Sequence, residues 1–222
     1  MPILKKSSYT IKDIYALPEG ERAELIDGRI YAMAPPNRLH QKLVMELSHV
    51  IKSYIEKNNG ECEVYPSPFE VFLNKDEKIY VEPDISVICD KDKLNDRGCV
   101  GAPDFVIEVV SKSSRKMDYI TKNALYSDAG VREYWIVDSE KERTTIYYYE
   151  QDEAPMIILF TQTIQSGIYE GLEINISEFV ERFPELSLFF KAYSLLDSEM
   201  ICIFPYFCPY AESSREIREI FS

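Results

Sequence analysis

The stretch GAPDFVIEVVS, from Gly101 to Ser111, decides the fold of this chain. Its inner part, DFVIEVV, is an almost unbroken apolar run rich in β-branched residues, which predicts a central strand covered on both faces. Glu108 lies in the middle of this run. An ionised carboxylate is costly there unless it is paired, hydrogen-bonded or bound to a cation. We therefore favour a functional role for Glu108 over a structural ion pair with an arginine.

A second apolar run, VEPDISVICD, carries Asp84 directly after a proline. We expect a strand from Ile79 to Cys89, with Asp84 close to Glu108 on the neighbouring strand. An aspartate after a proline is also common in turns, so Asp84 is a candidate functional residue only when it is considered together with Glu108.

A basic helix, RKMDYITKNALY, is predicted directly after the central strand. Lys122 follows Asp118 by one turn, and the ordinary interpretation is an i, i+4 ion pair on a solvated face, worth about 0.3–0.5 kcal/mol. The functional interpretation places the Lys122 ammonium over a scissile phosphate, where it orients the attacking water. Two acids on neighbouring strands followed by this lysine are the elements of a Mg²⁺-dependent phosphodiesterase site.

Three further residues have both a structural and a functional interpretation. Glu24, before the Asp27-Gly28 turn, is either a charge at a strand edge or an outer ligand of the metal. His40 is more often a packing or capping residue near a helix N-terminus, and a water or phosphate contact is the alternative. Asp104 shares a strand face with Glu108, either as a metal ligand or, as we favour, as an acceptor for backbone donors where the strand begins.

The composition bounds the class of protein. A chain of 222 residues with 45% hydrophobic residues is globular and can form one well-buried α/β domain, with or without an appendage. The five cysteines are odd in number and lack CxxC spacing, which argues for a reducing cytoplasm and against a disulfide framework or a zinc site. No run is long enough to cross a bilayer, and the first ten residues lack an apolar signal stretch. We expect a cytoplasmic protein without a membrane partner.

The net charge of −13 is the main argument against a nucleic-acid partner, because Lys and Arg hold polyanions. Net charge governs steering and solubility, however, rather than the chemistry of a local site. The segment from Ser111 to Lys122 has four basic residues against Asp118 alone, beside the candidate acids. This local excess weakens the objection without removing it.

The remaining patterns predict a mixed sheet flanked by helices. A capping box opens a short helix from Thr10 to about Leu17, and the clearest helix covers Leu39 to Ile55. A strand is expected from Glu63 to Leu73, and Asp90 to Val100 is expected to be a surface loop. We predict one domain over residues 1–183 and an appendage of undefined role, rich in aromatics and proline, over residues 184–222.

Four motifs, in this order, resemble the PD-(D/E)XK nuclease superfamily, and more narrowly its restriction-endonuclease-like branch known as the Uma family. They are ELIDGRIYAM with a following Ala-Pro-Pro and His40, EPDISVI, GAPDFVIEVVS, and DYITKNALYSDAGVREYWIVD. The resemblance covers roughly Tyr9 to Phe179. It implies a restriction-endonuclease-like core, in which a mixed sheet is flanked by helices and a divalent metal is bound at the sheet.

The resemblance also implies roles for particular residues. Asp84 would be the motif aspartate and Glu108 the second acid, and together they would hold Mg²⁺ or Mn²⁺ with a backbone carbonyl near Val109. Glu24 matches an acid that would complete the metal site.

The basic residues depart from the family pattern. Val110 stands where the usual lysine is found, two residues after the second acid, so Lys122 from the following helix would take over its role. Lys112 is the fallback. We expect contacts to the substrate from His40, Lys112 and Arg115.

The resulting hypothesis is a cytoplasmic, Mg²⁺-dependent endonuclease that hydrolyses DNA phosphodiester bonds without marked sequence specificity. By analogy with this fold, it would act as a homodimer. Two alternatives remain open. A catalytically inactive relative, kept as a DNA-binding or protein-interaction module, would fit the acidic charge and the missing lysine after Glu108. A metal-dependent phosphodiesterase would act instead on RNA or a small nucleotide.

Overall fold

A computed structural model describes residues 8–74 and 78–181, and the predictions made for residues 184–222 lie outside this part of the chain. Its helices are α1 (Ile11–Tyr15), α2 (Arg38–Lys57), α3 (Asn123–Ala129) and α4 (Ser177–Glu181). Its strands are β1 (Ala23–Ile26), β2 (Arg29–Ala32), β3 (Glu63–Pro66), β4 (Glu70–Phe72), β5 (Ile79–Val81), β6 (Ile85–Ile88), β7 (Gly98–Val100), β8 (Phe105–Val110), β9 (Glu133–Asp138), β10 (Arg143–Tyr148), β11 (Met156–Leu159), β12 (Thr163–Gln165) and β13 (Glu173–Asn175).

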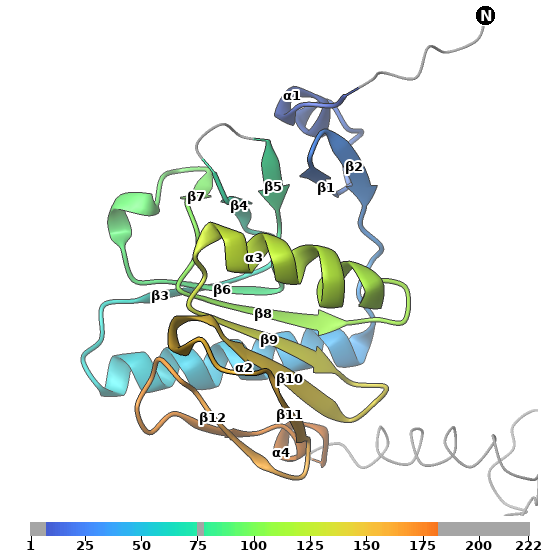
Figure 1. The fold of residues 1–222 in the computed structure, drawn as a ribbon. Coiled ribbons are helices and arrows are strands. Elements are labelled where there is room, and N and C mark those ends of the chain that lie inside the picture. The colour runs from blue at the N-terminus through green and yellow to red at the C-terminus, as the bar shows by residue number, and fades with distance from the viewer. Residues whose placement is uncertain (1–7, 75–77, 182–222) are drawn as a thin grey trace, which may run out of the picture. The chain divides into compact units, whose positions relative to one another are not determined.

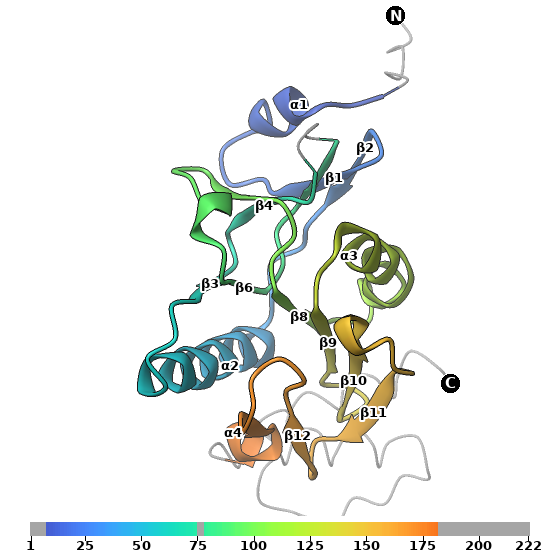
Figure 2. The same ribbon diagram turned by 60° about the vertical axis from the view of Figure 1, so that its left-hand side comes forward.

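The strands form two larger sheets and a small hairpin (Figure 1). The larger sheet has the order β11-β10-β9-β8-β6-β3, the second has the order β2-β1-β5-β4-β7, and β12 pairs with β13. Helix α2 covers one face of the larger sheet and α3 the other, as Figure 2 shows. The predicted mixed sheet flanked by helices is confirmed.

Strand β8 is the centre of the larger sheet, as its apolar sequence predicts. All six of its residues are buried, and it pairs antiparallel with β6 and parallel with β9. Val106 and Val110 pack in one core cluster with Tyr126 of α3. Because side chains alternate along a strand, Glu108 shares this face and points toward α3.

Two predicted strands are wrong in their extent, because each is divided between the two sheets. The run from Ile79 to Cys89 forms β5 in one sheet and β6 in the other, with Pro83 between them, and the run from Glu63 to Leu73 is divided in the same way at Ser67-Pro68. Proline has no N–H to continue a ladder, so neither run continues as one strand past its proline. The division places Asp84 at the junction of the two sheets.

The local signals at the turn and the helix starts are confirmed. Asp27 and Gly28 have positive φ values of 48° and 73°, as a tight turn between β1 and β2 requires. The Thr10 backbone N–H donates to Asp13 Oδ2 at 2.7 Å, closing the capping box of α1. The Asn37 side chain accepts from the His40 N–H at 2.9 Å and starts α2.

Two expectations are corrected outside the core strands. The segment from Asp90 to Val100 is not a loop throughout, because β7 at its end pairs parallel with β4. A disulfide joins Cys62 to Cys89, whose Cα atoms lie 3.9 Å apart. Cys62 directly precedes Glu63 and Cys89 directly follows Ile88, and these two residues are paired across β3 and β6, an adjacency that cysteine spacing along the chain does not reveal. No helix in the described ranges combines the length and the apolar character needed to span a membrane.

Candidate active site

The helical segment after β8 positions the basic partner of Glu108. It begins where Ser111 Oγ accepts from the Ser114 N–H at 3.2 Å, contains a π-helical turn at Met117–Lys122, and continues as α3. Asp118, Lys122 and Tyr126 follow one another at four-residue intervals. In a regular α-helix the first and last of three such residues would diverge by roughly 80°. The wider π-helical turn reduces this divergence, and all three side chains are buried.

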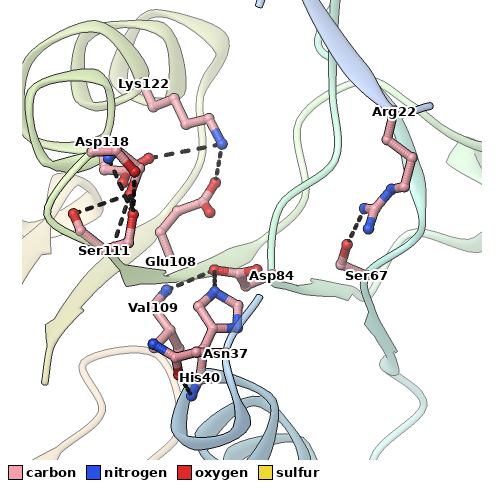
Figure 3. Close-up of polar contacts among 12 residues, drawn as sticks. Arg22, Asn37, His40, Ser67, Asp84, Glu108, Val109, Ser111, Asp118 and Lys122 are labelled. Carbon is pink, nitrogen blue, oxygen red and sulfur yellow. Dashed lines mark hydrogen bonds and ion pairs between the residues drawn. The ribbon is translucent and has the colours of Figure 1, made fainter. Parts of the chain in front are cut away.

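Lys122 joins acids from two different sheets. Its Nζ lies 2.8 Å from Glu108 Oε1 on β8 and 2.8 Å from Glu24 Oε1 on β1. Figure 3 shows the Lys122 and Glu108 side chains pointing toward each other from the helix and the strand. Asp118 Oδ1 is more distant from Nζ, at 3.8 Å. With Lys122 only 4% exposed, these contacts are not a surface ion pair on a solvated helix face.

Glu108 has a second donor that the sequence analysis did not single out. The Tyr126 hydroxyl donates to Glu108 Oε1 at 2.7 Å, the same oxygen that Lys122 contacts. The signal available in the sequence was the four-residue spacing from Lys122, which places both side chains on one face of the predicted helix.

The cluster has more carboxylates than cations. Burial raises the pKa of Glu108 well above its usual range, and the nearby charges of Asp84 and Asp118 raise it further, against the lowering effect of Lys122. Burial likewise raises the pKa of Asp118 to about 6. Burial alone would lower the pKa of Lys122, but the carboxylates outweigh it and keep the ammonium protonated. One buried ammonium therefore faces Glu24, Glu108 and Asp118.

Asp84 lies at the start of β6, where continuing the β6–β8 register by one residue places it opposite Glu108. Its Oδ2 accepts from the Val109 backbone N–H at 2.8 Å and lies 3.0 Å from His40 Nε2 on α2 (Figure 3). His40, a candidate substrate contact from the sequence, is therefore placed against Asp84. Its Nδ1 is buried and has no hydrogen-bond partner among the described residues.

The other candidates lie apart from these acids. Arg115 donates to both Asp138 oxygens, at 3.0 and 2.9 Å, and also to Glu140, and the Asp138 hydrogen bonds raise its pKa. Lys112 is exposed between β8 and the helical segment. Asp104 accepts from the Cys89 backbone N–H at 2.8 Å, which is the role that we favoured for it.

The donor set fits a hard divalent cation. No three His, Cys, Asp or Glu side chains in residues 8–74 and 78–181 form a ready-made metal cage. Mg²⁺ does not need one, because it usually takes one or two carboxylates and completes its shell with water and substrate phosphate. In the described structure, Glu108 uses Oε1 for its protein hydrogen bonds and Asp84 uses Oδ2. The second oxygen of each acid remains as a ligand of the type that Mg²⁺ or Mn²⁺ prefers.

Comparisons with known proteins place the chain in a family. Two proteins of Synechocystis sp. (strain ATCC 27184 / PCC 6803 / Kazusa) are similar in sequence. The uncharacterized protein slr1290 is 28% identical over 140 residues, covering 63% of this chain and 72% of its own. The uncharacterized protein sll1609 is 27% identical over 121 residues, covering 53% of this chain and 67% of its own.

A solved structure shares the fold. It is described as "a putative nuclease belonging to DUF820" from Anabaena variabilis ATCC 29413, and it matches with a TM-score of 0.62 at 20% identity. The match covers 78% of this chain and 97% of the other. The model of the Uma2 family, described as "Putative restriction endonuclease", matches residues 11–177. Since that match extends over most of the sequence, the chain belongs to the Uma2 family.

Proposed function

We propose that this chain is a Mg²⁺- or Mn²⁺-dependent endonuclease that hydrolyses phosphodiester bonds in DNA. The observation that carries the proposal is the buried contact of Lys122 with Glu108, at the point where Asp84 meets the same strand. The description of the Uma2 family and that of the Anabaena protein support the reaction class.

The two acids of the β6–β8 pair would hold the cation. Asp84 would bind it through Oδ1 and Glu108 through Oε2, the oxygens that their protein hydrogen bonds leave available. When bound there, Mg²⁺ supplies Lewis-acid polarisation of a phosphate oxygen. His40 holds the Asp84 carboxylate from α2, and the Val109 N–H holds it from β8, so the acid does not have to reorganise on binding.

Lys122 would act on the substrate. An ammonium has three donors, and Glu108 and Glu24 take two of them. The third would hydrogen-bond the attacking water or a phosphate oxygen and offset the charge that develops in the transition state. Cleavage of both DNA strands would take two such sites, one in each chain of a homodimer.

A plasmid-nicking assay tests the proposal. Supercoiled plasmid is incubated with the full chain and Mg²⁺ or Mn²⁺, with EDTA, or with the variants Glu108→Gln and Glu140→Gln. Glu140 is the matched control, because it is an exposed acid that contacts Arg115 rather than Lys122. We expect metal-dependent nicking by the wild type and Glu140→Gln, and none by Glu108→Gln.

Other outcomes separate the alternatives. Nicking that persists in EDTA or in Glu108→Gln contradicts the proposal. A wild-type chain that shifts DNA in a gel without nicking it is a binding module. Cleavage of RNA but not of plasmid DNA identifies the RNA-directed phosphodiesterase.

A further inference from the structure

The Glu108 carboxylate receives two donors on one oxygen and lies at the centre of the proposed metal site. Lys122 Nζ is 2.8 Å from Oε1, and the Tyr126 hydroxyl is 2.7 Å from the same atom. Within the described ranges, Oε2 has no protein donor. The two oxygens of the carboxylate therefore differ, because Oε1 has two protein donors and Oε2 is available to another ligand.

Lys122 alone would not fix the orientation of the Glu108 carboxylate. Its ammonium is shared with Glu24 on another sheet, and rotation about the last bond of a glutamate is only broadly restricted. A second donor from a different direction restricts the plane of the carboxylate. The Tyr126 hydroxyl supplies that donor from α3.

We propose that Tyr126 is a positioning residue of the metal site, whose hydroxyl, together with Lys122, occupies Glu108 Oε1 and so directs Oε2 to the divalent cation. This inference rests on the proposed function, since it assigns a role around the same acid. Partners of this kind, which orient a metal ligand without touching the metal, commonly change metal affinity by ten- to a hundredfold.

The surroundings of Tyr126 suit this role. Its side chain is fully buried, and its ring meets the Tyr134 ring edge-on with centroids 4.9 Å apart, so the hydroxyl has a fixed direction. A tyrosine hydroxyl can donate one hydrogen bond, and here it donates to Glu108.

Tyr134 provides a matched control. It is also fully buried in the same core cluster, but its hydroxyl donates to the Asp118 backbone carbonyl at 3.2 Å rather than to Glu108. Tyr126→Phe and Tyr134→Phe each remove one buried hydroxyl. Only the first changes a contact of the metal-binding acid.

The experiment measures Mn²⁺ binding to the full chain by isothermal titration calorimetry for the wild type and both variants, with thermal unfolding recorded in EDTA. We expect Tyr126→Phe to raise the Mn²⁺ dissociation constant about tenfold and Tyr134→Phe to leave it unchanged. In the nicking assay, Tyr126→Phe should need about tenfold more Mn²⁺ for half-maximal rate and recover most of the wild-type rate at saturating Mn²⁺. A general loss of structure would lower the rate at every metal concentration.

Three results would overturn the inference. If Tyr126→Phe binds Mn²⁺ as the wild type does, Tyr126 does not position the acid, while metal-dependent nicking by the wild type would leave the proposed function standing. If both variants lose affinity equally, the effect belongs to the core and not to Glu108. If the wild type neither binds Mn²⁺ nor nicks DNA, both proposals fail together.

Discussion

Glu108 and Glu133 are buried carboxylates on adjacent parallel strands, β8 and β9, but they differ in their hydrogen-bond partners. Trp135 Nε1 donates to Glu133 Oε1 at 2.6 Å. Ser166 Oγ and the backbone N–H of Gly167 both donate to Glu133 Oε2 at 2.9 Å. Neutral donors thus satisfy both oxygens of Glu133 and join β9 to the loop before β13.

Glu108 has a charged partner, further acids nearby and protein donors on only one oxygen. Burial raises the pKa of both glutamates, but hydrogen bonds from neutral groups oppose the rise at Glu133, whereas neighbouring carboxylates add to it at Glu108. The comparison teaches that burial alone does not distinguish the two acids. The excess of negative charge around Glu108, and its one oxygen without a protein donor, are what favour a functional role for Glu108 rather than Glu133.

The largest expected effect comes from exchanging each acid for its amide. Glu108→Gln should lower the nicking rate about a thousandfold, because a Lewis-acid cation supplies several kcal/mol to the transition state. Glu133→Gln should retain the rate but unfold at lower urea concentration, because an amide nitrogen then faces donors that need an acceptor. Paired measurements of nicking rate and urea midpoint check this. An equal loss of rate in both variants would erase the distinction between the two acids.

The next effect concerns the buried Lys122 ammonium. Lys122→Met leaves Glu108 and Glu24 without their countercharge, which should cost about 3 kcal/mol in the free energy of unfolding at pH 7. The loss should shrink at pH 5, where the raised pKa values of Glu108 and Asp118 let these two acids take up protons. Lys116→Met, at an exposed position in the same helical segment, is the control. A destabilisation that is equally large at both pH values would contradict the charge imbalance.

The smallest effect isolates Asp118. Its pKa rises from 3.8 to about 6 on folding, so the stability it contributes is fully present below about pH 4 and is lost as the pH rises through 6. Asp118→Asn stays neutral, so it should be more stable than the wild type by about 2 kcal/mol at pH 7, and by little at pH 4.

Urea unfolding between pH 4 and pH 7 measures this difference. Asp128→Asn, at an exposed position on α3, should follow the wild-type curve. A wild type that becomes more stable between pH 4 and pH 6 relative to Asp118→Asn would reverse the predicted sign.

The sequence was sufficient to predict β8, Glu108 and the approach of Lys122. An acid inside an apolar β-branched run has few explanations, and a helix after a strand must pack back on the sheet. Glu133 is the first residue of an equally apolar strand, and the sequence around it does not indicate that neutral donors from residues 166–168 hydrogen-bond its carboxylate.

Features that depend on distant pairing could not be predicted. An apolar run does not show which sheet it joins, so the transfer between sheets at Pro83 appeared only in the structure. Cys62 and Cys89 are 27 residues apart and become neighbours only through the β3–β6 register. The π-helical turn has no sequence signature comparable to a capping box, and Tyr126 was not singled out from the sequence.

The most direct test of the central claim is a Mn²⁺ titration followed by electron paramagnetic resonance, applied to the wild type, Glu108→Gln and Glu133→Gln. It counts bound cations whether or not a substrate has been found. We predict that the wild type and Glu133→Gln bind Mn²⁺ with the same affinity and that Glu108→Gln loses this binding. Undiminished binding by Glu108→Gln would contradict the assignment of the cation to the β6–β8 acids.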